Sequence, residues 1–270
     1  MADAGLTLDE WLPRVPRLLD ECVERWQLRL GEPYASGAAG YAVRADLPDG
    51  TPAVLKLSNP HREAEQEADA LERWDGDGAV RLLARDDERN ALLLERCVPG
   101  TVLSAWDGDT LGVLIGLLPR LWKSGDGFAS LADEAESWAA CLEDVRDPLL
   151  KDAALHYIRE LAPTQGEQVL VNQDLHGENV LAAEREPWLV IDPKPLAGER
   201  EFSVSSIVRS FELGHSKRDA LYRLDRLTAE LGLDRERARG WTIAQTVAWS
   251  GGSDYVTMHV ETVNWLLEDA

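Results

Sequence analysis

The spacing of apolar residues changes along this chain, and that change constrains the fold more than any other feature. Residues 41–47 alternate between apolar and polar side chains, Pro48-Asp49-Gly50 follows, and residues 53–57 are again mostly apolar. Two such runs around a Pro-Asp-Gly turn predict a β-hairpin. From residue 101 onward, apolar residues recur mostly at helical spacing. We therefore expect an α+β chain with a strand-rich first third and a helix-rich remainder.

The same reasoning assigns the other elements. Helical spacing predicts helices within residues 8–30, 61–74, 111–122, 130–161, 202–213, 217–231, 234–249 and 255–268, the fourth broken near Pro148. Short apolar runs predict strands at residues 80–84, 91–97, 169–171 and 188–191. Because Pro99-Gly100 separates the two patterns, we expect a first lobe over residues 1–96, a hinge over 97–100 and a second lobe over 101–270, with a cleft between the lobes.

The charge balance limits the partners that this chain can have. Its 270 residues include 28 basic and 49 acidic ones, which gives a formal net charge of −21. A surface this acidic repels phosphate backbones, and we therefore expect no nucleic-acid partner. The same charge attracts cationic small molecules, so a cationic acceptor is expected. Apolar stretches are too short for a membrane span, and no obligate protein partner is inferred. The N-terminus resembles no secretion signal, and Cys22, Cys97 and Cys141 show no paired spacing, so a cytoplasmic location is expected.

One polar segment carries a set of oxygen ligands. Asp174 and Asn179 are five positions apart, and Asp192 follows an apolar run thirteen residues later. Hard cations such as Mg²⁺ prefer carboxylate and amide oxygens, especially where substrate phosphates complete the coordination shell. The Asp-x-x-x-x-Asn spacing is that of a kinase catalytic loop. A capped loop with local hydrogen bonds is the alternative, and the carboxylate at the end of a strand argues against it.

These residues also carry a family resemblance. Asp174-Leu175-His176 with Asn179, followed by Ile191-Asp192-Pro193, resembles the aminoglycoside phosphotransferase branch of the protein-kinase-like fold. Residues 178–196 are similar to the streptomycin 6-kinase and hydroxyurea kinase subgroup, and the similarity extends over residues 8–267. The resemblance implies a bilobal fold, with a small antiparallel-sheet N-lobe and a larger, mainly helical C-lobe. It also implies that Asp174 is the catalytic base and that Asn179 and Asp192 bind Mg²⁺.

The activity that the resemblance implies is transfer of the γ-phosphate of ATP to a hydroxyl of a small molecule. A streptomycin-like aminoglycoside, inactivated by the added phosphate, is the leading acceptor. Hydroxyurea, a viomycin-type peptide antibiotic or another metabolite are alternatives within the same chemistry. A weakly active or non-catalytic nucleotide-binding module is the alternative from a different class.

Lys56 is the expected phosphate-binding lysine. It lies inside the apolar run 53–57, where alternation alone also permits a lysine on the solvent face of a strand. An acidic helix follows directly, as the Lys–Glu ion pair of kinases requires. Glu67 matches the family position best, and Glu63, four residues earlier on the same helix face, is the second choice.

The resemblance assigns the remaining nucleotide contacts to backbone groups. Ser36 and Gly37 lie where the family places its nucleotide-covering loop, although two glycines before a strand also form an ordinary turn. Glu95 and Cys97 lie in the connector formed by residues 94–100, which contains the expected hinge, and would contact adenine through their backbone.

Two positions depart from the family pattern. Asn172-Gln173 replaces the usual His-Gly before the catalytic aspartate, and Ser203 replaces an aspartate that braces the catalytic loop. The usual histidine forms scaffold hydrogen bonds within the active-site core, and we expect Asn172 to form similar ones. Because Ser203 replaces the bracing aspartate, we expect either that other residues brace the catalytic loop or that the loop is looser. Lys194 could add positive charge near the transferring phosphoryl group, or it could be a surface lysine between two prolines. His176 is expected to be structural.

The acceptor site is the least constrained. Trp249 precedes a Gly-Ser break between two helices, and Asp254 and Glu261 follow it. These carboxylates could face a guanidinium group of the acceptor, although solvated surface carboxylates are the simpler explanation.

Overall fold

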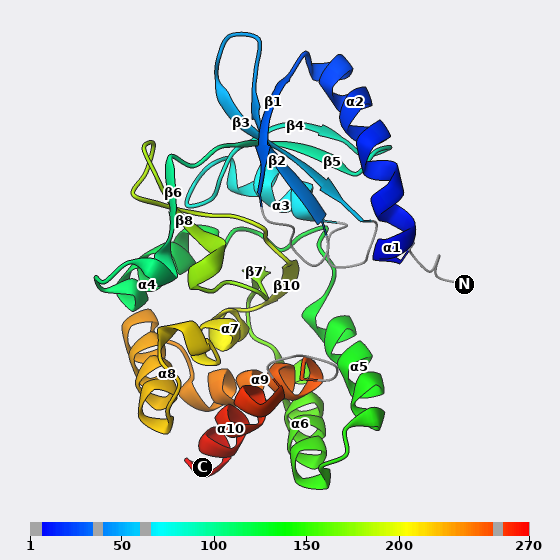
Figure 1. Cartoon of the computed structure of the whole chain (residues 1–270). Coiled ribbons are helices and arrows are strands. Elements are labelled where there is room, and N and C mark those ends of the chain that lie inside the picture. Colours follow the sequence, from blue (N-terminus) through cyan, green and yellow to red (C-terminus); the bar gives the residue numbers. More distant parts are fainter. Residues whose placement is uncertain (1–6, 35–39, 60–65, 251–255, 270) are drawn as a thin grey trace. The chain divides into compact units, whose positions relative to one another are not determined.

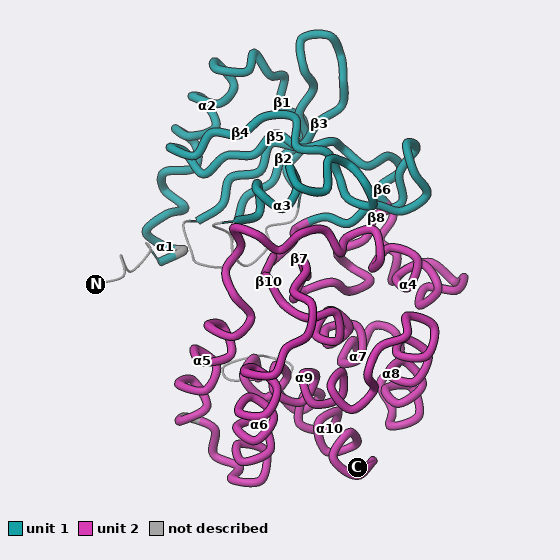
Figure 2. The backbone as a smooth tube through the Cα atoms, turned by 180° about the vertical axis from the view of Figure 1, so that it is seen from behind, with its two compact units in different colours: residues 1–100, 182–191 teal, residues 101–181, 192–270 magenta. Residues whose placement is uncertain are grey.

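The computed structural model describes residues 7–34, 40–59, 66–250 and 256–269, and it divides the chain into two compact units (Figure 2). Unit 1 contains residues 1–100 and 182–191, and unit 2 contains residues 101–181 and 192–270. Residues 182–191, expected in the second lobe, therefore group with the first. The cause is strand pairing, because the N–H of Val80 donates to Val190 and the N–H of Val190 donates to Gly78, at 3.0 and 2.9 Å.

Unit 1 is built on an antiparallel sheet (Figure 1). Its order is β1-β2-β3-β5-β4, with β1 at Arg29–Pro33, β2 at Gly40–Asp46, β3 at Pro52–Ser58, β4 at Leu82–Asp86 and β5 at Ala91–Glu95. The predicted hairpin is confirmed as β2 and β3, in which Ala42 pairs with Lys56. Small and branched apolar side chains of β3 alternate into the core, where Ala53, Leu55 and Leu57 are fully buried.

The described residues of unit 1 also form helices α1 (Leu8–Trp11), α2 (Val15–Trp26) and α3 (Glu67–Trp74). Trp11, Val15 and Cys22 pack in the same buried cluster as the inner face of β2 and β3. The helix predicted within residues 8–30 is interrupted by a 3-10 turn at Leu12–Arg14. It ends at Gln27, whose backbone is left-handed (φ 54°), so that β1 can begin two residues later.

Unit 2 is mainly helical (Figure 1). Its helices are α4 (Thr110–Leu121), α5 (Leu131–Cys141), α6 (Pro148–Leu161), α7 (Ser205–Val208), α8 (Lys217–Leu231), α9 (Arg235–Ala248) and α10 (Val256–Leu267). The predicted break near Pro148 is present, because Asp147 caps α6 by accepting the N–H of Leu149 at 2.9 Å. Helix α9 is central, since it packs against α6, α8 and α10 and is buried throughout Ala238–Val247.

Two antiparallel strands of unit 2 position the candidate active site. These are β7 (Gln168–Asn172) and β10 (Pro195–Glu199), which pair Asn172 with Pro195. The segment leaving β7 and the segment entering β10 therefore start from the same end of one ladder. Three short strands, β6 (Pro99–Val102), β8 (Val180–Ala183) and β9 (Trp188–Val190), lie where the chain passes from one unit to the other. No helix in the described part of the chain is long and apolar enough to cross a membrane.

A buried carboxylate holds the β7–β10 ladder to α9. Glu199 is 1% exposed and accepts hydrogen bonds from Arg237 Nη2 at 2.7 Å, from the Trp241 indole and from the N–H of Gly166. Removing one member of such a buried pair strands the other groups without partners. Glu199→Gln is therefore expected to lower the free energy of unfolding by about 3 kcal/mol, measured by urea denaturation.

The matched control is Glu167→Gln. Glu167 accepts from Arg200 at 2.7 Å but is 71% exposed, so its loss should change stability by less than about 0.5 kcal/mol. Equal effects of the two variants would contradict the structural role given to Glu199.

Candidate active site

The loop after β7 is fixed by side-chain hydrogen bonds to its backbone. Asn172 is 3% exposed, and its Oδ1 accepts the N–H of Asp174 at 3.1 Å and the N–H of Lys194 at 3.0 Å. Asn179 donates from Nδ2 to the carbonyl of Asp174 at 3.0 Å. Asn172 thus ties together the two segments that carry Asp174 and Asp192, which is bracing work of the kind expected of it.

The bracing expected of Ser203 is carried by other residues. Ser203 donates to the carbonyl of Arg200 at 2.6 Å and accepts from the Trp122 indole at 3.2 Å. Ser206, on α7, instead donates to the carbonyl of Leu175 at 2.8 Å and so reaches the catalytic loop. The loop that carries Asp174 is therefore still braced from this part of the chain, by Ser206 and not by Ser203.

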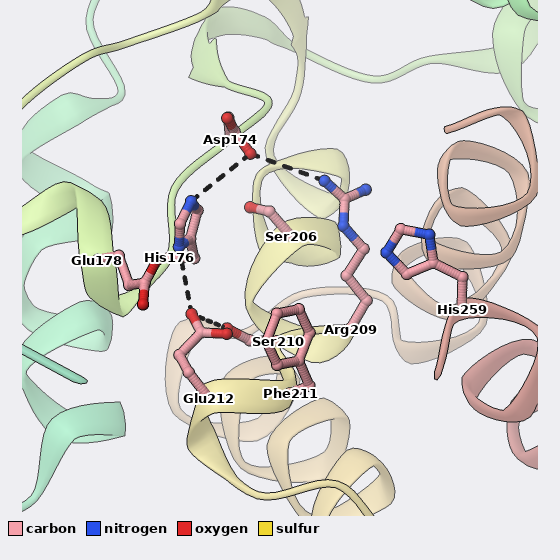
Figure 3. A pocket seen from close by; sticks show the side chains of 9 residues that line it. All are labelled: Asp174, His176, Glu178, Ser206, Arg209, Ser210, Phe211, Glu212 and His259. Atoms are coloured by element: carbon pink, nitrogen blue, oxygen red, sulfur yellow. Dashed lines mark hydrogen bonds and ion pairs between the residues drawn. The ribbon is translucent and has the colours of Figure 1, made fainter. Parts of the chain in front are cut away.

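Asp174 lies on the wall of a pocket in unit 2 (Figure 3). Its Oδ2 is 3.2 Å from Lys194 Nζ, and its Oδ1 is 3.8 Å from both Arg209 Nη2 and His176 Nε2. The carboxylate is thus oriented by cations on one side and by the loop on the other. An acceptor hydroxyl placed in this pocket would lie within reach of a proton-accepting oxygen.

His176 and Glu212 form an ion pair on the other side of the pocket (Figure 3). His176 Nδ1 is 3.2 Å from Glu212 Oε1, and His176 Nε2 is 3.1 Å from Asn179 Nδ2. Although burial opposes the imidazolium form, the hydrogen bond to Glu212 and the charge of Asp174 raise the pKa of His176. Burial also opposes ionisation of Glu212, but its bonds to His176 and Ser210 lower the pKa of Glu212 to about 2. Glu212 also accepts the N–H of Gly177 at 3.2 Å, so this pair shapes the loop.

Glu212→Gln is expected to lower the pKa of His176, followed by NMR titration of its ring signals. The amide removes the anion facing Nδ1, while burial continues to disfavour the charged ring. Because the pKa of His176 is raised in the folded state, its charge stabilises the wild type below the unfolded pKa of about 6.5, and this contribution is lost as the pH rises through the folded value. The control is Glu261→Gln, which removes the partner of His215 at 2.9 Å and should leave His176 unchanged. An unaltered His176 titration in Glu212→Gln would refute the pairing.

Asp192 occupies the turn between β9 and β10. It is exposed, and its backbone is left-handed (φ 51°), a conformation uncommon for residues other than glycine. Among the described residues, no group of three or more His, Cys, Asp or Glu side chains could hold a metal ion. The two ligands predicted from the sequence, Asp192 and Asn179, would give a cation one carboxylate and one amide oxygen. This donor set fits Mg²⁺, which commonly keeps waters and binds substrate phosphates besides one or two carboxylates.

In unit 1, Lys56 and Glu67 form a close ion pair. Lys56 Nζ donates to both carboxylate oxygens of Glu67, at 2.7 and 2.6 Å, and Glu67 is 2% exposed. The pair joins β3 to the first turn of α3, so the structure selects Glu67 as the partner; Glu63 lies outside the described residues. Ser36 and Gly37 also lie outside the described residues.

The two expected hinge residues differ in the backbone groups that they can offer. The N–H of Glu95 donates to the carbonyl of Arg81 at 2.9 Å, so it is committed to the sheet. The carboxylate of Glu95 accepts from Arg185 Nε at 2.8 Å and Nη2 at 2.9 Å. Cys97 is half-buried, and burial raises the pKa of its thiol to about 12, so it stays a neutral thiol. Adenine recognition by the N–H of Glu95 is not available in this geometry.

Of the three residues proposed for the acceptor, the structure describes Trp249 and Glu261, and neither is part of the pocket lining. Trp249 contacts Lys194 Nζ and the Arg209 guanidinium, at 5.0 and 4.5 Å from its ring centroid. Glu261 pairs with His215 and does not line the pocket, and Asp254 lies outside the described residues. The sequence interpretation missed Arg209 and Glu212, which do line it. For Arg209, the sequence offered one signal, which is that this arginine directly follows the apolar residues Ile207 and Val208.

A small antiparallel sheet with a buried Lys–Glu pair, followed in the chain by a helical unit that presents an aspartate–asparagine loop, defines the class of protein-kinase-like phosphotransferases. The crystal structure of choline kinase LicA from Streptococcus pneumoniae has this fold, with a TM-score of 0.69 at 14% identity over 94% of this chain and 99% of that one. The aminoglycoside/hydroxyurea antibiotic resistance kinase family matches residues 25–253. The chain belongs to this family.

Two curated relatives cover most of the chain. Streptomycin 6-kinase from Streptomyces griseus is 38% identical over 251 residues, which are 87% of this chain and 81% of that protein. Hydroxyurea phosphotransferase from Kitasatospora aureofaciens is 39% identical over 253 residues, 88% of this chain and 73% of that protein. The family resemblance and the α+β kinase-like fold expected from the sequence are both confirmed.

Proposed function

We propose that this protein transfers the γ-phosphate of ATP to a hydroxyl of a small antibiotic, with a streptomycin-type aminoglycoside as the first candidate. The observation that carries the proposal is the position of Asp174. It lies at a pocket, on a loop fixed by Asn172 and Asn179, in a chain of the antibiotic resistance kinase family. Inactivation of the drug would follow from the charge and bulk of the added phosphate.

Each proposed nucleotide contact has a defined role. Lys56, held by Glu67, would bind the α- and β-phosphates, and the carbonyl of Glu95 and the backbone of Cys97 would contact adenine. Asn179 and Asp192 would bind Mg²⁺, which neutralises charge on the phosphates. Asp174 would orient the acceptor hydroxyl and accept its proton. A cytoplasmic location, where ATP is available, completes the proposal.

The lining of the pocket supports a cationic acceptor. Glu178 is exposed at the pocket, and Glu212 stays ionised at neutral pH because its pKa is held at about 2. Carboxylates bind guanidinium groups through paired, charge-assisted hydrogen bonds. Streptomycin carries two such groups on its streptidine ring, whereas hydroxyurea is neutral and would gain nothing from this wall.

Hydroxyurea remains a second candidate for one reason. The hydroxyurea phosphotransferase is 39% identical to this chain, and the streptomycin 6-kinase is 38% identical, so overall similarity does not separate them. A viomycin-type peptide is a further cationic candidate.

The test is a coupled assay of ATP consumption with streptomycin, hydroxyurea or viomycin as acceptor. We expect consumption to depend on streptomycin and on Mg²⁺, and mass spectrometry to find a monophosphorylated drug. Consumption that depends on hydroxyurea alone would replace the proposed acceptor. Nucleotide binding without consumption under any acceptor would favour a non-catalytic module.

A further inference from the structure

Two buried arginines of unit 2 use their donors very differently. Arg223, 3% exposed, donates to the carbonyls of Val208, Leu213 and Gly214 at 2.8–3.1 Å. Arg209 is 8% exposed, and among the described residues its side chain makes one hydrogen bond, from Nη1 to Gln245 Oε1 at 2.7 Å. Arg223 is therefore a structural arginine, whereas most donors of Arg209 have no acceptor in the described part of the protein.

The unused donors of Arg209 face the pocket (Figure 3). Its Nη2 is 3.8 Å from Asp174 Oδ1, which is too far for a hydrogen bond. Burial lowers the pKa of Arg209 to about 10, so the guanidinium is still charged at neutral pH. No side-chain nitrogen of Arg209 is among the enclosed, unpaired polar atoms of the described residues, so its free donors open onto the pocket. Such an arrangement is typical of a site that an anionic ligand completes.

A second cation lies beside the first. Lys194 Nζ is 3.2 Å from the other oxygen of Asp174 and 5.0 Å from the ring centroid of Trp249. The Arg209 guanidinium contacts the same ring at 4.5 Å. Trp249 thus lies against both cations, next to the carboxylate of Asp174. The acidic side chains Glu178 and Glu212 lie on the other side of the pocket (Figure 3).

We propose that Arg209 and Lys194 bind the phosphoryl group while it is being transferred, and that Trp249 and Gln245 hold the two cations in place for this purpose. The inference rests on the proposed kinase function and adds two catalytic residues to it. The two cations lie 3.2 and 3.8 Å from the Asp174 oxygens, so a phosphoryl group attacked by a hydroxyl bound to Asp174 would be transferred beside them, and that group is an anion.

Phosphoryl transfer forms one bond to phosphorus and breaks another. The acceptor oxygen forms a bond to the γ-phosphorus while the bond from that phosphorus to the bridging oxygen breaks, and its electron pair leaves with ADP. Asp174 takes the hydroxyl proton. Negative charge is spread over the three equatorial oxygens during this exchange, and fixed cations beside them stabilise it more than they stabilise bound ATP.

The test uses isothermal titration with Mg·ADP, alone and with aluminium fluoride as a mimic of the transferring group, each with and without streptomycin. The variants are Arg209→Met, Lys194→Met and the charge-conserving Arg209→Lys. We expect the Mg·ADP affinity of the methionine variants to stay within about twofold of the wild type, and the gain from aluminium fluoride to fall at least about tenfold. Arg209→Lys should retain part of the gain.

Lys217→Met is the matched control, because Lys217 pairs with Glu268 at the surface at 2.8 Å and should leave both affinities unchanged. Thermal unfolding checks the fold of each variant, and if Arg209→Met does not fold, Lys194→Met and Arg209→Lys carry the test. Failure of the wild type to bind Mg·ADP would refute the proposed function itself. A wild type that binds Mg·ADP without any gain from aluminium fluoride, or variants that keep the full gain, would overturn the inference alone.

Discussion

Replacing Asp174 by asparagine is expected to reduce turnover a hundredfold or more and to leave Mg·ATP affinity nearly unchanged. The amide has almost the same shape, so Lys194 and the loop should stay in place, but it cannot accept the acceptor proton. The measurement is steady-state ATP consumption with the acceptor found by the screen, together with nucleotide titration.

The control is again Glu167→Gln, a carboxylate-to-amide change at the surface pair with Arg200, which should retain full turnover. Normal turnover in Asp174→Asn would show that the proton leaves by another route and that the base is assigned wrongly.

Asp192→Asn is expected to have the opposite profile and to weaken Mg·ATP binding about tenfold or more. In the proposed function, Asp192 would give a charged oxygen to a cation with few other protein ligands, so its neutralisation should act on metal-bound nucleotide. Titrations with Mg²⁺ and with EDTA separate the two contributions. In the wild type, Mg²⁺ should strengthen nucleotide binding, and in the variant this difference should largely disappear.

The two variants check one another, because Asp174→Asn should keep the Mg²⁺-dependent gain that Asp192→Asn loses. An unchanged Mg²⁺ dependence in Asp192→Asn would count against its role as a metal ligand, whatever its turnover.

The sequence predicts well those helices and strands that are buried on one face only, because their apolar and polar residues then alternate at a regular spacing. The β2–β3 hairpin is an example, because alternation and the Pro-Asp-Gly turn together fix its register. Strands β1 and β10 were missed for opposite reasons. Every residue of β1 is exposed and every residue of β10 is buried, so neither strand alternates.

Some residues of the candidate site can be predicted from short stretches of sequence, whereas others depend on contacts between distant parts of the chain. Asp174, Asn179 and Asp192 could be proposed from the sequence because their spacing is encoded over a short stretch of chain. Lys56 and Glu67 were found because an acidic helix follows the strand, and the structure joins them at 2.6–2.7 Å.

The remaining pocket residues gain their meaning only from tertiary packing. Arg209 and Glu212 lie in a segment whose local pattern suggested one helix over residues 202–213, whereas α7 covers only Ser205–Val208. Which of their donors and acceptors stay unused depends on Gln245 and His176, which are 36 residues away in each case. No local spacing encodes such a partnership.

The excursion of residues 182–191 into unit 1 has a consequence for how the chain is made. Val190 supplies backbone partners to Gly78 and Val80, and Arg185 supplies the counter-ion of Glu95. During synthesis, the bonds that Val190 and Arg185 make to the first hundred residues can form only after almost a hundred further residues have been added. The protein therefore cannot be divided at residue 100 into two independently complete fragments, and a gene cut there should yield a first half that is less resistant to proteolysis than the same region in the intact chain.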